Sequence, residues 1–384
     1  MRTELIDADD AELIRQVRQA AAGFRRRNPL TRAPWEASSY PIAAYIDGRP
    51  AVKTLAWFPG PGCTWSEAGG CLMCNFGTSI PGSADPISLF ADHLAELDRS
   101  TEHLHIGPGG SFYDERETPT AHRHGVLRAL AALPELRTVG IETRPNLVTQ
   151  AHLRRTLDDL PSGVTRLILG FGLECWDDFT RELSVNKGYS RDSIVRAAEV
   201  IDKVNAEQSS VQVEFETYVL LKPTLLSERE AVDEALRTID WSFRVGAGTT
   251  ALFMNTVKDA TVQGFLASSG SVAEPLRYRT PYLRSAIEVL RRLPDEMRIR
   301  TSVLGVQSGI QATGGPRGCE RCYPFLLGAI YAHNFTRIAD SLETAARSWC
   351  PCKSEWSTEM AQSPSRSLRD RASALLRTLA EESA

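Results

Sequence analysis

The chain has 384 residues, 42% of them hydrophobic, enough for one large catalytic domain with an added segment or for two ordinary domains. Its formal net charge of −4 argues against the broad phosphate-binding surface of a stand-alone nucleic-acid-binding protein. No signal peptide is visible, and no stretch reaches the ~18 apolar residues of a membrane span. We therefore expect a cytoplasmic protein whose eight cysteines are metal ligands or reactive thiols rather than disulfides.

The first 50 residues predict one helix, at about 8–27, and then an irregular lead-in that ends at the turn Asp47-Gly48. The helix closes with three consecutive arginines at 25–27. We interpret this run as a solvated helix end.

Beyond residue 50, short apolar runs alternate with helical patterns. The expected strands are 52–58, 103–107, 138–143, 165–171, 211–221 and 249–254, with a weaker one at 298–304. The expected helices between them are 86–99, 118–133, 147–159, 190–206, 228–243 and 278–293. A strand followed by a helix, repeated about six times, predicts a parallel α/β sheet or a partial (β/α)6 barrel of TIM type. In such folds the functional residues gather at the C-terminal ends of the strands.

This pattern divides the chain into a helical lead-in at 1–50, a partial barrel at 51–305 and a tail at 306–384. The tail breaks the alternation, because it carries four cysteines and then a helical pattern at 365–382. We expect it to form a cysteine-rich, metal-binding extension of the barrel.

Three cysteines follow the first expected strand directly, in the segment GCTWSEAGGCLMCNFG. Seven residues separate Cys63 from Cys71, and two separate Cys71 from Cys74. Three thiolates on one loop can hold three irons of a [4Fe-4S] cluster and leave the fourth iron open to chelate S-adenosylmethionine (SAM). The alternative is a zinc knuckle, but zinc requires four ligands, and the next candidate, His93, lies on an expected helix.

Further motifs follow the later strands in order. They are GGSFYD at 109–114, ETRP at 142–145, GLE at 172–174, NKG at 186–188, LLKPT at 220–224 and NTV at 255–257. With the cysteine segment, they resemble the radical SAM family that includes the archaeosine-synthesis radical enzyme and, more distantly, the elongator catalytic subunit. Thr224 stands where that family has a second proline. The resemblance runs from about residue 50 to 356 and does not cover the first 50 residues or the last helix.

The resemblance implies a barrel of radical SAM type with a [4Fe-4S] cluster on Cys63, Cys71 and Cys74. It places SAM against the strand-end motifs and the residues beside the third cysteine. The candidate SAM-binding residues are Met73, Phe76, Gly109, Gly110, Ser111, Glu142, Arg144, Glu174 and Lys187. The charged ones end apolar strands, where a buried charge must be paired or must bind something polar. A structural Glu–Arg pair is the alternative to SAM binding.

Three residues are candidates for direct contact with the reaction. Lys222 and Asn255 either face the substrate or support the mouth of the barrel. Cys175 is either a buried, inert thiol or a thiol near SAM that donates a hydrogen atom.

The tail cysteines form two close pairs, Cys319 with Cys322 and Cys350 with Cys352, separated by 27 residues. Two such pairs predict a metal site. We favour a second, auxiliary [4Fe-4S] cluster that relays electrons, holds the substrate or supplies sulfide, and structural zinc is the alternative.

We therefore expect a radical SAM enzyme that accepts electrons from a donor such as flavodoxin or ferredoxin and abstracts hydrogen from a nucleoside- or nucleotide-type small molecule in a natural-product (antibiotic) pathway. Sulfur-for-oxygen exchange in a thionucleoside, with the second cluster as sulfur donor, is a specific version. One alternative is tRNA base modification of the archaeosine type, with a partner protein that binds the RNA. Another is a zinc-binding interaction protein without enzymatic activity. We expect no membrane contact.

Overall fold

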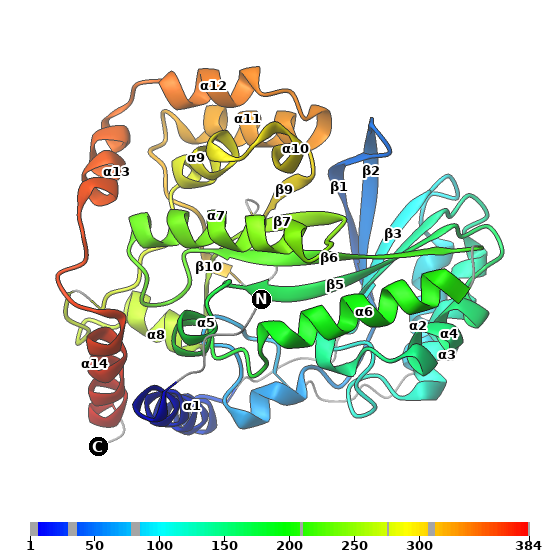
Figure 1. The fold of residues 1–384 in the computed structure, drawn as a ribbon, viewed down its shortest axis with the longest axis horizontal. Helices are drawn as coiled ribbons and strands as arrows, with labels where there is room; N and C mark the ends of the chain where they lie inside the picture. The colour runs from blue at the N-terminus through cyan, green and yellow to red at the C-terminus, as the bar shows by residue number, and fades with distance from the viewer. Residues whose placement is uncertain are drawn as a thin grey trace.

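The computed structural model describes residues 7–29, 37–77, 85–207, 210–274, 276–305 and 312–382. One eight-stranded sheet lies at its centre (Figure 1). Its strands, in order across the sheet, are β1 (Ser38–Ile46), β2 (Arg49–Trp57), β3 (His103–Gly107), β4 (Thr138–Glu142), β5 (Arg166–Glu174), β6 (Gln212–Leu221), β7 (Thr249–Met254) and β9 (Thr301–Leu304). From β2 across to β9 the neighbouring strands of this sheet pair in parallel, and β1 is antiparallel to β2. The expected parallel α/β fold is confirmed.

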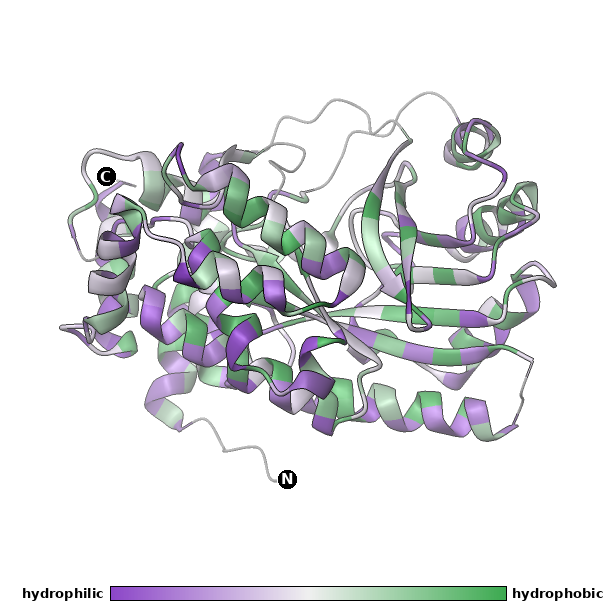
Figure 2. Cartoon of the chain, turned by 90° about the horizontal axis from the view of Figure 1, so that it is seen from above, coloured by the Kyte–Doolittle hydropathy of each residue, from purple (hydrophilic) through white to green (hydrophobic). Residues whose placement is uncertain are grey.

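Helices connect consecutive parallel strands and cover the outer face of the sheet. They are α2 (Pro86–Ala95), α3 (Thr120–Ala129), α4 (Gln150–Asp159), α6 (Arg191–Glu207), α7 (Glu228–Arg244) and α9 (Leu283–Arg292). Figure 2 shows hydrophobic and hydrophilic residues alternating along these helices, as expected for helices with one face on a core. Within the described part of the chain, no helix combines the length and apolar character that a membrane crossing requires.

Shorter elements complete the chain. They are η1 (Thr64–Ala68), η2 (Leu130–Ala132), η3 (Pro145–Leu147), α5 (Asp178–Ser184), the small sheet of β8 (Val257–Lys258) and β10 (Ala312–Gly314), α8 (Val262–Ser268) and α10 (Asp295–Arg298). The terminal helices are α1 (Ala8–Arg27), α11 (Tyr323–Thr336), α12 (Asp340–Arg347), α13 (Pro351–Ala361) and α14 (Leu368–Glu381). α1 and α14 pack together at the lower left of Figure 1.

The stretch before residue 50 is not irregular throughout, in contrast to the sequence expectation. β1 forms a hairpin with β2 around Asp47 and Gly48, whose φ angles are 52° and 77°. β1 is an edge strand, where Pro41 is tolerated although it has no N–H to donate. Most of its side chains are half-buried on both faces, so no apolar alternation announces it. The expected boundary at residue 50 thus falls inside a hairpin.

The sheet is a barrel that is open on one side, because its two edge strands, β1 and β9, do not pair with each other. α11 contacts β1, β2 and β9. This helix therefore covers the open side of the barrel and belongs to its wall.

Candidate active site

A cavity of about 1590 Å³ lies at the C-terminal ends of the parallel strands. The residues expected to hold the first cluster or to bind SAM line this cavity. They are Cys63, Cys71, Met73, Cys74, Phe76, Gly109, Gly110, Ser111, Glu142, Arg144, Glu174 and Lys187, together with Asn255. Because consecutive parallel strands end at the same rim, motifs far apart in the sequence meet in one space.

The loop with the first three cysteines is held by its own backbone and by one buried side chain. Ser66 N–H donates to the carbonyl of Cys63 (3.1 Å), and Cys74 N–H donates to the carbonyl of Cys71 (3.1 Å). Leu72, between these two cysteines, is buried in a hydrophobic core. Burial raises the pKa of Cys63 to about 11, so its thiol is neutral until a metal replaces the proton.

Glu117 joins this loop to the glycine turn after β3. Its fully buried carboxylate accepts hydrogen bonds from Thr64 N–H (2.8 Å) and from Ser111 N–H, and Arg144 Nη2 lies 3.1 Å away. Sequence reasoning missed Glu117, because it lies in an acidic loop with no periodic pattern. Its position three residues after the GGSFYD motif was the only signal.

Glu174 and Lys187 form an ion pair of 2.7 Å in the cavity wall. Burial alone would lower the pKa of Lys187, but Glu174 raises it well above its usual value. Gly172 makes room for this pair, because a Cβ there would lie 2.3 Å from Lys187 Nζ. The pair therefore presents a fixed, charged surface to a polar ligand.

Glu142 and Arg144 do not pair with each other. Arg144 pairs with Asp114 and Glu117, and its Nε is buried with no hydrogen-bond partner in the described part of the chain. Glu142 Oε1 instead lies 3.5 Å from the side chains of His105 and Tyr218. Arg144 therefore matches the alternative of a structural ion pair, but its partners are Asp114 and Glu117 and not Glu142.

The floor of the cavity contains a polar group that the sequence analysis did not identify. Tyr218 lines the cavity, and its hydroxyl lies 3.1 Å from His105 Nε2. Glu216 is buried behind it and lies 3.6 Å from His105 Nδ1. Alternation along β6 places Glu216 and Tyr218 on the same face, so a period-two pattern of polar residues inside an apolar strand was a usable signal.

Lys222 does not line the cavity. Its Nζ makes a buried ion pair with Glu228 Oε2 (2.7 Å), so its contacts fit support of the barrel mouth. Asn255 does line the cavity, but its side-chain N–H groups donate to the carbonyl of Lys222 (2.9 Å) and to Gln263 Oε1 (2.8 Å).

Cys175 is fully buried and outside the cavity lining, and it belongs to a small core against which Cys71 and Met73 pack. Burial raises the pKa of its thiol well above the usual value. Its surroundings match those of an inert thiol, and a role near SAM stays a prediction.

The four tail cysteines converge on one point, with all four Sγ atoms within 4.8 Å of one another. Neighbouring Sγ atoms lie 3.1 to 3.4 Å apart. Burial would raise the pKa of Cys350, but hydrogen bonds from Cys352 and Arg284 lower it to about 6. None of the four lines the cavity.

No protein-family model matches the chain. The archaeosine synthase subunit beta of Methanosarcina acetivorans is 29% identical over 351 residues, which are 88% of this chain and 94% of that protein. The protein of the same name from Thermococcus kodakarensis is 27% identical over 323 residues, 81% of this chain and 92% of that one. An uncharacterized protein of Methanocaldococcus jannaschii is 24% identical over 305 residues, 77% of this chain and 78% of that one.

Two solved structures of the radical S-adenosylmethionine methyltransferase TsrM from Kitasatospora setae are also similar. The one with cobalamin and a [4Fe-4S] cluster has a TM-score of 0.42 and 10% identity, and covers 86% of this chain and 61% of that one. The one with tryptophan and a SAM analogue has a TM-score of 0.43 and 12% identity, and covers 86% and 62%. The chain thus spans about three fifths of the length of these structures. By sequence, the chain is similar to the archaeosine synthase beta subunits, and its motifs and their order resemble those of radical SAM enzymes.

Proposed function

We propose that the chain is a radical SAM enzyme. The observation that carries this proposal is that Cys63, Cys71 and Cys74 share one cavity with the strand-end motifs that follow β3, β4 and β5. When bound, the cluster and SAM supply a reductive cleavage that yields a 5′-deoxyadenosyl radical. The protein contributes the positions of these groups and the exclusion of competing donors.

Two parts of the wall, the glycine turn after β3 and the Glu174–Lys187 pair, fit the polar ends of SAM. Gly109 has a φ of 67°, and Gly110 is pressed between Glu117 Oε2 and the carbonyl of Gly62, at 2.6 and 2.9 Å from where a Cβ would lie. Only glycine, which has no side chain, fits there, and its backbone can therefore approach the amino group of SAM closely. The Glu174–Lys187 pair offers an acceptor to ribose hydroxyls and a donor to a carboxylate.

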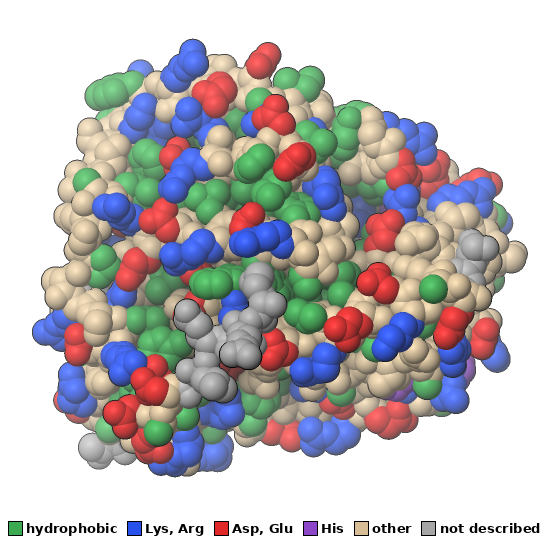
Figure 3. All heavy atoms as spheres, viewed as in Figure 1, with side chains coloured by type: hydrophobic (Ala, Val, Ile, Leu, Met, Phe, Trp, Pro, Cys, Tyr) green, Lys and Arg blue, Asp and Glu red, His purple; other side chains and the backbone are tan. Residues whose placement is uncertain are grey.

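The size and lining of the cavity support a nucleoside- or nucleotide-type small molecule as substrate. At about 1590 Å³, the cavity exceeds the ~300–1,000 Å³ of a typical single-ligand site, so a second molecule fits beside SAM. Aromatic side chains on which a base can stack line it, among them Tyr40, Trp57 and Tyr218. Figure 3 shows acidic and basic side chains interspersed over the visible face, with no broad basic surface for RNA.

A second candidate, base modification in tRNA with a partner protein, is favoured by a different observation. Two relatives are named archaeosine synthase subunit beta, and a beta subunit implies another subunit. The matched residues span 94% of the relative from M. acetivorans, so the similarity extends over nearly all of that subunit.

For the tail cysteines, the geometry favours the zinc alternative over the auxiliary cluster. Tetrahedral zinc with Zn–S bonds of 2.3 Å places its sulfur ligands about 3.8 Å apart, whereas the cysteine sulfurs around a four-iron cube lie about 6 Å apart. All four Sγ atoms here lie within 4.8 Å of one another. We therefore propose one zinc ion at this site.

The position of the tail site also bears on sulfur transfer. Cys319 and Cys322 precede α11, which lines the cavity from Tyr331 onward. The helix between Cys322 and Tyr331 is roughly 13 Å long. A sulfur-for-oxygen exchange in the cavity would therefore need a sulfur source other than this site.

Anaerobic reconstitution with iron and sulfide tests the radical SAM proposal. The reconstituted protein should release 5′-deoxyadenosine from SAM under dithionite, measured by liquid chromatography. Cys63→Ala, Cys71→Ala and Cys74→Ala should each abolish this product, because an open cluster needs all three thiolates. Samples without reductant are the control, and product from any of the three variants would overturn the assignment.

Deuterium transfer tests the substrate class. We expect deuterium to enter 5′-deoxyadenosine from ribose-deuterated nucleosides or nucleotides supplied as a mixture. Transfer from deuterated tRNA alone would support the second candidate instead. Transfer from neither would exclude both substrates.

A further inference from the structure

The helix α1 packs directly against the cysteine loop. A Cβ on Gly69 would lie 2.9 Å from the backbone nitrogen of Ala22 and 3.1 Å from the carbonyl oxygen of Arg18, so the loop and the helix touch backbone to backbone. Leu72, between Cys71 and Cys74, shares a core with Phe24 of α1. The helix that lies outside the family resemblance is therefore the support behind the loop.

Arg25, near the end of this helix, turns toward the loop instead of toward solvent. Its Nη2 donates to the carbonyl of Cys74 (2.7 Å) and is 3.4 Å from that of Cys71. Its Nη1 is buried and has no hydrogen-bond partner in the described ranges. Arg26 and Arg27 are exposed, so the interpretation of a solvated basic run holds for these two and is wrong for Arg25.

The guanidinium of Arg25 lies within electrostatic reach of all three loop cysteines. Burial lowers its pKa, and Cys74, Cys71 and Cys63, once deprotonated to bind a metal, act in the opposite direction. An arginine starts from a pKa above 12, so it stays charged in neutral solution. Arg25 is not part of the cavity lining, so this charge acts from behind the loop without touching SAM or substrate.

We propose that Arg25 is a positioning residue that raises the reduction potential of the [4Fe-4S] cluster on Cys63, Cys71 and Cys74. This inference rests on the proposed function. Reduction adds one negative charge to the cluster, and a fixed positive charge behind the loop stabilises that state more than the oxidised one. Net charge and hydrogen bonding around the cluster are the factors by which a protein sets such a potential.

A redox titration followed by electron paramagnetic resonance measures the effect on the reconstituted, full-length protein. In Arg25→Gln, the reduction equilibrium should shift at least about tenfold toward the oxidised cluster, which is 59 mV for one electron. Arg25→Lys keeps the charge and should stay close to the wild type. Arg26→Gln removes the same charge from the exposed neighbour and is the matched control, with an unchanged potential expected.

Three outcomes would overturn the proposal. One is an unchanged potential in Arg25→Gln, even if less iron is retained, because the residue would then only hold the loop. Another is an equal shift in Arg26→Gln, which would indicate a general charge effect. If Arg25→Gln holds no cluster, Arg25→Met removes the charge in its place: a tenfold shift toward the oxidised cluster supports the proposal, and an unchanged potential contradicts it.

The result separates this inference from the proposed function. A wild-type protein that assembles no [4Fe-4S] cluster, or that assembles one and never cleaves SAM, refutes the radical SAM assignment. A wild-type protein that does both, with variants of equal potential, refutes only the role of Arg25.

Discussion

Single buried charges hold the cysteine loop, and Glu117 shows how. Its carboxylate meets one N–H from the loop, one from the glycine turn and the guanidinium of Arg144. The sequence identified the charged residues at strand ends, because an apolar strand makes them conspicuous. It could not identify Glu117, Arg25 or the pairing of Arg144, because those depend on which loops meet in space.

Glu117→Gln should destabilise the fold by about 3 kcal/mol, because it leaves the charge of Arg144 partly uncompensated and turns an acceptor into a donor facing N–H groups. Urea unfolding of the protein measures this loss. Glu67, an exposed acid of the cysteine loop, pairs with exposed Arg116, and Glu67→Gln should cost about 0.5 kcal/mol or less. If both variants lose the same unfolding free energy, the buried contacts of Glu117 contribute no more to stability than the exposed pair of Glu67.

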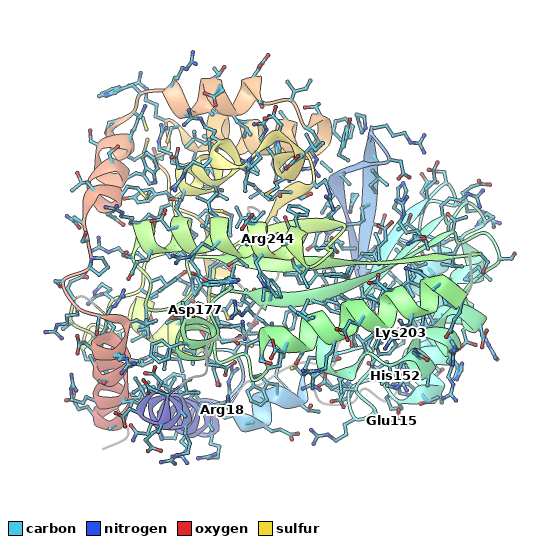
Figure 4. The ribbon with its side chains drawn as sticks, viewed as in Figure 1. Arg18, Glu115, His152, Asp177, Lys203 and Arg244 are labelled. Carbon is cyan, nitrogen blue, oxygen red and sulfur yellow. The ribbon has the colours of Figure 1, made fainter. Side chains whose placement is uncertain are left out.

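At the scale of elements, the parallel strands were predictable and the supports around them were not. Apolar runs at 103–107 and 249–254 coincide with β3 and β7, because a strand buried on both faces leaves a continuous signal. β1 left no such signal in the sequence, because it is an edge strand whose side chains are mostly half-buried on both faces. The amphipathic pattern predicted α1 as a helix, but not that it packs against the loop, where Arg18 (labelled in Figure 4) lies over the ring of Trp65.

Gly69→Ala tests the contact between α1 and the loop. The residue has a φ of 104°, and its new methyl group would meet the backbone of Ala22 at 2.9 Å. We expect a loss of at least about 2 kcal/mol in unfolding free energy, from backbone strain together with displacement of the helix. Urea unfolding provides the measurement.

Gly270→Ala is the control for this substitution, because Gly270 is exposed and a Cβ there meets nothing within 4 Å. It should be neutral or slightly stabilising. If Gly69→Ala behaves in the same way, the close packing of α1 on the loop is wrong.

At the scale of the whole molecule, the tail completes the barrel. Cys319 and Cys322 precede α11 and Cys350 and Cys352 begin α13, so one ion would join two helices that are distant in the sequence. The spacing of the cysteines predicted a shared metal site. It could not predict the distance of this site from the cavity, because that distance is set by the length and direction of α11.

Metal analysis of the reconstituted protein should give four irons and one zinc per chain. Removal of the zinc by a chelator should lower the melting temperature, because the ion's binding energy contributes to folding. Cys350→Ser should lose zinc and leave the iron content unchanged. Eight irons per chain, or a joint loss of iron and zinc in this variant, would contradict the assignment.

The helical wall of the cavity has a consequence for how such a protein changes its substrate. Tyr331, Asn334 and Phe335 reach the cavity from α11, while the loop cysteines and the glycine turn reach it from the strands. The α11 residues therefore border the space together with strand residues such as Tyr40 and Trp57, but they lie on an element that carries none of the loop cysteines. Repacking this one helix would reshape part of the substrate space while the loop cysteines and the glycine turn stay unchanged.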